Sequence, residues 1–187
     1  MKKFIMSAVM AIVALTASAQ KGEYYITPHL GFGYLNMSNL GDLSGGIGGT
    51  LGVDFEYMVA DQFGLSAGLD AFYGESNKEN DCYNSYSYIN IPVLAQYHFG
   101  NFAVKAGLQP AFIVDADGHI GDVSASAKDG FNSFSLALPV GISYTFNTPI
   151  TLDLRCAIPL TKQNKESEPG FDDSKLTTVM LSVGYRF

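Results

Sequence analysis

The segment from Tyr88 to Val114 reads YINIPVLAQYHFGNFAVKAGLQPAFIV and contains two alternating runs joined by Gly100-Asn101. In each run a large apolar side chain recurs at nearly every second position, and the side chains between them are polar or small. An alternation of period two is typical of β-strands, and a Gly-Asn pair between two such runs predicts a hairpin. The apolar face carries no charge, so the pattern fits either a hairpin over a soluble core or one wall of a membrane barrel.

The same alternation continues through the rest of the chain. Six further runs show it, at residues 24–34, 47–57, 63–73, 134–146, 150–158 and 177–187. Together with the two runs of the opening hairpin they predict eight strands. Long polar connections, at 36–46, 75–87, 116–132 and 162–174, alternate with short ones. This order is typical of an up-and-down barrel with short turns at one end and long loops at the other.

Charged residues of the predicted strands all fall on the face opposite the large apolar side chains. They are Asp54, Glu56, Asp70, Lys105, Asp153, Arg155 and Arg186, and His29 and His98 share that face. A soluble barrel of the lipocalin type carries charge outside and apolar side chains inside, and burying these charges in such a core would be costly. We therefore expect lipid outside and a polar interior network. Its predicted members are Asp54, Glu56, Asp70, His98, Lys105, Asp153, Arg155 and Arg186.

Aromatic residues gather at both ends of the predicted strands. With the amino terminus on the periplasmic side, that rim would carry Tyr24, Tyr57, Phe63, Tyr97, Phe99, Phe102, Tyr144, Phe146, Tyr185 and Phe187. The other rim would carry Tyr34, Tyr73, Phe112 and Phe134. Two aromatic girdles are typical of outer-membrane barrels. The predicted fold is all-β, an eight-stranded antiparallel up-and-down transmembrane β-barrel.

The amino terminus has the pattern of a secretory signal peptide. Lys2 and Lys3 precede an apolar run from Phe4 to Leu15, and Ala17-Ser18-Ala19 follows it. A basic region, a short apolar region and small residues at a cleavage site predict export and removal of residues 1–19. The apolar run is shorter than the roughly 20 residues that a membrane-spanning helix needs. Residues 20–187 then form one outer-membrane β-barrel domain.

Composition narrows the range of partners. The chain of 187 residues has a formal net charge of −7, which disfavours binding to nucleic acid. An exported chain with two cysteines permits one disulfide, but Cys156 falls on the outward face of its run, away from the loop that holds Cys82. We therefore expect no bridge between them.

Several short motifs give the chain a family pattern. They are Ile89-Asn90-Ile91-Pro92-Val93 with Tyr97-His98-Phe99, Lys105-Ala106-Gly107-Leu108-Gln109-Pro110, Leu152-Asp153-Leu154-Arg155 and Gly184-Tyr185-Arg186-Phe187. With them, residues 20–187 resemble the small outer-membrane β-barrel family of Gram-negative bacteria, also described as the porin family. The resemblance implies a place in the outer membrane, in contact with its lipid. It also implies that Tyr185 and Phe187 form the signal that the outer-membrane assembly machinery reads, and it implies no common activity.

The interior network supports two interpretations. Its charges could line a narrow conduit, or they could neutralise one another and fill the barrel. We favour filling, because eight strands leave little more than side-chain room inside, whereas open porins need about 16. The chain is then a structural or porin-like protein without catalysis, cofactor or metal.

Three alternatives come from other features. Adhesion or ligand capture would use the tyrosine-rich segment 81–88, although we expect Tyr86 and Tyr88 to join the outer aromatic girdle instead. An enzyme of the lipid acyltransferase or protease type would use the only loop grouping of His, acid and hydroxyl, which is His119, Asp117, Asp122 and Ser124. A soluble lipocalin-like barrel would bind a small ligand.

Residues 115–122 have the look of a metal loop, with three aspartates and one histidine. Their spacing does not match an EF-hand, which places glycine at the sixth position. We therefore expect a solvated acidic loop.

Overall fold

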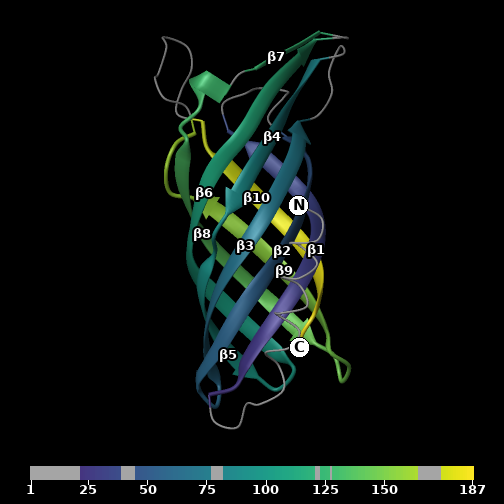
Figure 1. The fold of residues 1–187 in the computed structure, drawn as a ribbon, viewed down its shortest axis with the longest axis vertical. Coiled ribbons are helices and arrows are strands. Elements are labelled where there is room, and N and C mark those ends of the chain that lie inside the picture. The colour runs from purple at the N-terminus through teal and green to yellow at the C-terminus, as the bar shows by residue number, and fades with distance from the viewer. Residues whose placement is uncertain (1–21, 39–44, 77–81, 121–122, 127, 164–173) are drawn as a thin grey trace, which may run out of the picture.

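The computed structural model describes residues 22–38, 45–76, 82–120, 123–126, 128–163 and 174–187. The predicted signal peptide, residues 1–19, lies outside them. One antiparallel sheet of ten strands curls into a closed barrel (Figure 1). The strands are β1 (Tyr24–Met37), β2 (Gly45–Ala60), β3 (Phe63–Ser76), β4 (Cys82–Asn90), β5 (Val93–Phe99), β6 (Phe102–Ile120), β7 (Val123–Ser126), β8 (Phe134–Thr145), β9 (Ile150–Pro159) and β10 (Leu176–Tyr185). In this part of the chain, no helix is both long enough and apolar enough to cross a membrane.

The ten strands occupy eight positions around the barrel. β1 pairs with β2 on one side and with β10 on the other, which closes the ring. β4 and β5 lie end to end, since each pairs with β3 and with β6. β7 pairs with β6 alone, as the return strand of a short extension. The predicted eight-stranded up-and-down barrel is therefore confirmed.

The opening hairpin forms as predicted, with one interruption. Gly100 has a φ of +63° in the turn, a conformation that glycine adopts without strain. The first run divides into β4 and β5 at Ile91-Pro92, where proline has no N–H to donate to the ladder. Hydrogen bonding still spans the interruption, because Gly68 N donates to Pro92 O (2.8 Å) and Ile91 N donates to Pro110 O (2.8 Å).

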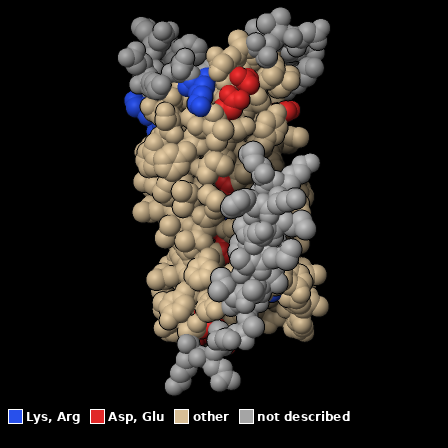
Figure 2. Space-filling view, viewed as in Figure 1, with Lys and Arg blue, Asp and Glu red and all other residues tan. Residues whose placement is uncertain are grey.

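The outer wall is apolar. Its exposed side chains include Leu30, Phe32, Ile47, Leu51, Leu69, Val93, Leu108, Ile142, Leu154 and Val183, although Ile26 on the same face is buried. The charged side chains visible in Figure 2 gather mainly at one end of the molecule. So extensive an apolar surface is expected only where lipid or another protein covers it. The soluble lipocalin-like alternative therefore does not fit.

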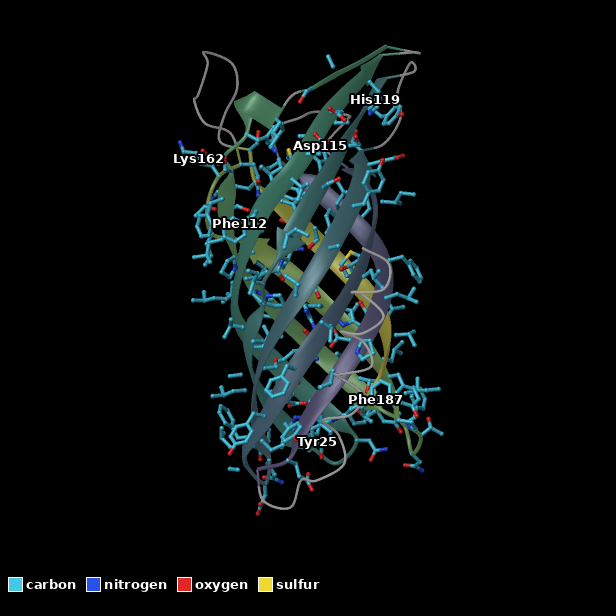
Figure 3. All side chains as sticks on the ribbon, viewed as in Figure 1. Tyr25, Phe112, Asp115, His119, Lys162 and Phe187 are labelled. Carbon is cyan, nitrogen blue, oxygen red and sulfur yellow. The ribbon has the colours of Figure 1, made fainter. Side chains whose placement is uncertain are left out.

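Aromatic side chains form both girdles. At the end that holds Phe187, ring centroids lie 4.6 Å apart in Tyr185–Phe187 and 4.7 Å apart in Phe102–Tyr144 (Figure 3). At the other end Phe112 and Phe134 pack with centroids 5.5 Å apart. The two girdles bound the wall, as the sequence pattern predicts.

Two of the predicted loops are largely strand. β3 continues to Ser76 and β4 begins at Cys82, so little of 75–87 is loop. Within 116–132, β6 continues to Ile120, and β7 and a 3₁₀ helix, η3 (Lys128–Gly130), follow it. Figure 1 shows β4 and β6 rising past the other strands. Beyond the outer girdle the outward face of a strand meets water and can be polar, so backbone pairing continues there without the apolar outward face on which the prediction relied.

The barrel interior at this end is apolar, which corrects the prediction of a polar interior throughout. A buried cluster fills it, with Phe131 and Leu176 packed against the cluster; its members are Leu35, Met37, Phe72, Tyr86, Tyr88, Ala111, Ile113, Ala116 and Met180. Where the outer surface leaves the lipid, the barrel follows the rule for soluble barrels, with apolar side chains inside.

Candidate functional site

The charged residues of the predicted network occupy the other half of the interior. Alternation along each strand directs their side chains inward. They come from five of the eight positions of the ring and from its carboxyl end: Asp54 and Glu56 from β2, Asp70 from β3, His98 from β5, Lys105 from β6, Asp153 and Arg155 from β9, and Arg186 just after β10. His29 on β1 joins them.

Arg155 is the centre of the network. Its guanidinium nitrogens lie 3.0 Å from Asp54 Oδ2, 3.6 Å from Asp70 Oδ2 and 3.4 Å from Asp153 Oδ1. Lys105 Nζ also pairs with Asp153. The guanidinium fork stays charged and offers five donors, so one arginine on β9 can hold carboxylates that project from β2 and β3.

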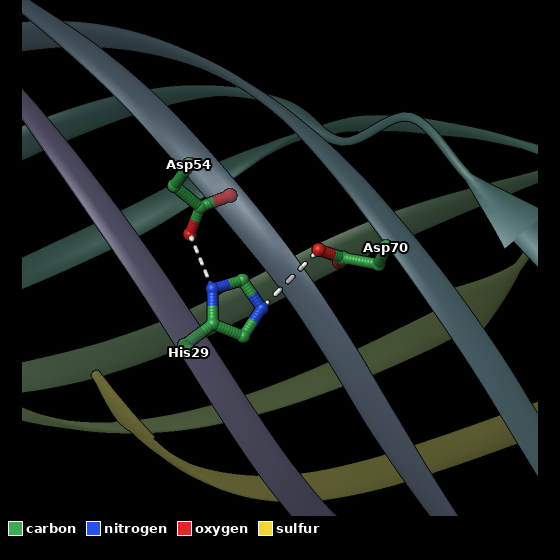
Figure 4. A group of neighbouring side chains, drawn as sticks. All are labelled: His29, Asp54 and Asp70. Atoms are coloured by element: carbon green, nitrogen blue, oxygen red, sulfur yellow. Dashed lines mark ion pairs between the residues drawn. The ribbon is translucent and has the colours of Figure 1, made fainter. Parts of the chain in front are cut away.

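His29 lies between two carboxylates (Figure 4). Its Nε2 is 3.2 Å from Asp70 Oδ1, and its Nδ1 is 3.9 Å from Asp54 Oδ2 and 3.3 Å from Thr27 O. Both ring nitrogens thus face oxygen atoms. The position favours positive charge at or beside the imidazole.

A second group lies nearer the end that holds Phe187. Glu56 accepts from Arg186 Nη2 (3.1 Å) and lies 2.6 Å from His98 Nε2. The Arg186 guanidinium also stacks over the Tyr25 ring, 3.6 Å from its centroid. These contacts link the start of β1 to the carboxyl terminus, where the ring closes.

With the two histidines left out of the count, the network holds one more acid than base. Asp54, Glu56, Asp70 and Asp153 stand against Lys105, Arg155 and Arg186 in the ion pairs of the described interior. Glu56 is matched by Arg186, so the unmatched charge belongs to the group around Arg155 and His29. The location of the excess negative charge follows from which residues pair, and the sequence alone does not give the pairs.

Two cavities border this group. One, of about 60 Å³, touches His29, Asp70 and Arg155 on the side of the apolar cluster. The other, of about 40 Å³, touches His29, Asp54 and Arg155 on the side of Arg186. His29, Arg155 and Ser182 line both, so these side chains lie between them. Each cavity has room for water.

Inward glycines make room for the carboxylates. A Cβ on Gly52 would overlap Asp70 Oδ1, and a Cβ on Gly68 would overlap Asp54 Oδ1. Gly52 lies opposite Asp70, and Asp54 opposite Gly68, in the ladder between β2 and β3. Each acid therefore leans over the glycine of the neighbouring strand.

We expect Gly52→Ala to lower the free energy of unfolding by about 1–3 kcal/mol, because the new methyl group displaces Asp70. The matched control is Gly49→Ala on the same strand, since a Cβ there points outward and meets nothing closer than 3.5 Å. Urea unfolding in lipid vesicles measures both changes. Equal unfolding midpoints for the two variants would contradict this account of the glycine.

The remaining sequence candidates are dispersed. Asp115 and Asp117 lie in β6, in an extended strand rather than a metal loop. His119 stacks on Tyr83 with centroids 4.3 Å apart, and its Nε2 is 3.3 Å from Ser85 Oγ, a partner that the sequence grouping missed. Asp122 and the Ser124 side chain lie outside the described parts.

Tyr86 and Tyr88 are not in the outer girdle, so that prediction is wrong. They are 2% and 3% exposed and belong to the interior apolar cluster, because the outward positions of β4 are the odd-numbered ones. Burial raises the pKa of Tyr86, beyond the outer girdle, to about 12, so its phenol stays neutral. Tyr88 Oη donates to Gln163 Oε1 (3.1 Å). Cys156 is a free thiol.

Comparison with known proteins points in one direction. A family model described as "Outer membrane protein beta-barrel domain" matches residues 4–187. No curated protein sequence matches the chain. Among solved structures, Ail of Yersinia pestis, in complex with the heparin analogue sucrose octasulfate, is 16% identical with a TM-score of 0.57, over 88% of this chain and 99% of that one. Neisserial surface protein A is 15% identical with a TM-score of 0.55, over 87% and 95%. At such identity these structures support the fold alone.

Proposed function

Because the chain belongs to the outer membrane protein β-barrel domain family, we propose that it is a closed structural barrel of the outer membrane that neither conducts solutes nor catalyses a reaction. Its location is the outer membrane of a Gram-negative bacterium. One observation carries the proposal: the Arg155 and His29 layer divides the interior into two small cavities.

A second blocked region of the interior supports the proposal that the barrel does not conduct solutes. The apolar cluster around Leu35, Met37 and Tyr86 fills the barrel on the far side of the larger cavity. Hydrated ions would have to cross both an ion-paired layer and an apolar layer. Each is costly to cross, because the ion loses hydration that neither layer replaces.

The absence of catalysis is supported by the surroundings of His119. Among the described side chains, the Ser85 hydroxyl lies 3.3 Å from His119 Nε2, and Ser85 is 8% exposed, so a substrate has little access to it. The adhesion alternative loses two of its three tyrosines, because Tyr86 and Tyr88 point inward. Only Tyr83 of that segment remains on the outer face, which ranks surface binding below a structural role.

Two partners belong to the proposal. Membrane lipid covers the apolar wall, and the assembly machinery reads the carboxy-terminal strand through Tyr185 and Phe187. Both rings are exposed at the rim. Phe187 N donates to Ile26 O (2.9 Å), so the terminal residue also completes the ladder with β1. The proposed signal therefore lies beside the seam where the barrel closes.

We expect the purified barrel to show no discrete current steps in a planar lipid bilayer. A 16-stranded porin added to the same membrane serves as the positive control. A heat-dependent shift in gel mobility, measured on the same sample, shows that the barrel is folded. Reproducible single-channel steps from folded protein would disprove the closed interior and favour a pore.

A further inference from the structure

We propose that His29, Asp54 and Asp70 form a binding site for one divalent transition-metal cation, with zinc as the best fit. The site goes beyond a closed structural barrel and does not depend on it. It lies in the barrel interior, where three neighbouring strands each supply one ligand (Figure 4).

The three side chains are close enough to converge on one ion after a side-chain rotation, because Asp70 contacts His29 Nε2 whereas Asp54 lies 3.9 Å from the other ring nitrogen, Nδ1. One ligand atom from each of the three side chains can be chosen so that all lie within 4.8 Å of one another. His29 Nε2 and Asp70 Oδ1 are 3.2 Å apart. Bond lengths of 2.0–2.2 Å at a tetrahedral angle place two zinc ligands about 3.4 Å apart. One imidazole and two carboxylates leave a fourth position, as in many zinc sites.

A further observation concerns two carboxylate oxygens that lack a well-formed hydrogen bond. Asp70 is 5% exposed, and its Oδ1 has the His29 Nε2 atom beside it at 3.2 Å without a hydrogen bond of good geometry; Asp54 Oδ1 also lacks a hydrogen-bond partner among the described residues. Arg155 approaches the Oδ2 atom of each acid instead. Buried acceptors are normally satisfied, so two such oxygens beside one imidazole indicate a missing cation.

The charge balance agrees. With His29 neutral, as a metal ligand must be, the acids around Arg155 exceed the bases by one. A divalent ion overcompensates by one charge, which a hydroxide or chloride ligand would cancel. The cavity of about 60 Å³ beside His29 and Asp70 has room for such a ligand.

The test uses the mature chain, refolded from urea into detergent micelles with Co²⁺ or Zn²⁺ present. We expect one Co²⁺ per chain, with the visible absorption of a tetrahedral complex, and its displacement by Zn²⁺. His29→Gln and Asp70→Asn should each weaken Co²⁺ binding at least tenfold. His119→Gln is the matched control, because His119 lies outside the network, and it should leave binding unchanged.

A measurement on the unmodified chain covers variants that fail to fold. The sequence has 3 histidines, so imidazole NMR signals can be assigned individually. Addition of Zn²⁺ should shift the His29 signals and leave those of His98 and His119 in place. No Co²⁺ binding to the folded chain, or a zinc response at His98 or His119 in place of His29, would overturn the proposal.

Discussion

Replacing Arg155 with methionine should destabilise the barrel by about 3–5 kcal/mol, the usual cost of removing one partner from a buried ion pair. Methionine keeps much of the length and apolar bulk of the side chain. The change leaves Asp54 and Asp70 with His29 as their only basic neighbour and Asp153 with Lys105 alone. The loss comes from buried carboxylates that have lost their counter-ion, so it should exceed that of any surface substitution.

Urea unfolding in lipid vesicles, followed by gel mobility, measures this effect. Lys128→Met, in the exposed 3₁₀ helix, is the control and should change stability by less than about 0.5 kcal/mol. Adding Asp70→Asn to Arg155→Met should recover part of the loss, because it removes one unpaired charge. If Arg155→Met unfolds at the same urea concentration as the unmodified chain, the network does not hold the interior together.

Replacing Leu51 with arginine should cost about 2–4 kcal/mol in a bilayer, as a charge on the lipid face of a barrel does near the midplane. Leu51 is 67% exposed and lies on β2 between the two girdles. In a water-soluble protein the same change at so exposed a position would alter stability by less than about 0.5 kcal/mol. The sign and size of the effect therefore test whether lipid covers the wall.

The matched control is Val59→Arg, on the same face of the same strand. Val59 is 47% exposed and lies two residues beyond Tyr57 of the girdle, where we expect it to be outside the hydrocarbon. Its substitution should cost no more than about 1 kcal/mol. Equal costs at the two positions, measured in the same vesicles, would refute the assigned depth of the wall.

The sequence predicts the membrane-embedded part of this fold well because lipid imposes a single rule there. Every outward side chain in that band must be uncharged, so the alternation in Val93–Phe99 and Phe102–Phe112 marks both the strands and their faces. The same rule identifies Asp54, Lys105 and Arg155 as inward residues. No knowledge of their partners is needed for this.

The rule that outward side chains are uncharged no longer applies where the barrel leaves the lipid. Beyond the outer girdle water replaces lipid, so the polar stretch Cys82–Ser87 has no alternation to mark it as strand, although it pairs with β6. For the same reason the sequence did not predict that Leu35, Met37 and Tyr86 would together form an apolar interior.

The sequence also does not predict which charged side chains of the network form ion pairs with one another. Arg155 meets Asp54 across the lumen, from a position 101 residues later in the chain. Which charges meet depends on how far each strand is staggered against the next as the ring closes. The alternation predicts whether a side chain points inward or outward, but it does not predict the position of the residue along the barrel axis.

The order of charges along the chain has a consequence for insertion. The acids Asp54, Glu56 and Asp70 belong to β2 and β3, whereas Lys105, Arg155 and Arg186 all come later. The inward side chains of the early β2–β3 hairpin are thus anionic. Those of the later strands are mainly cationic and attract them. A chain that ended before β9 would lack Arg155 and leave Asp54 and Asp70 with His29 as their only basic neighbour. The final hairpin is therefore what makes the first strands compatible with the membrane.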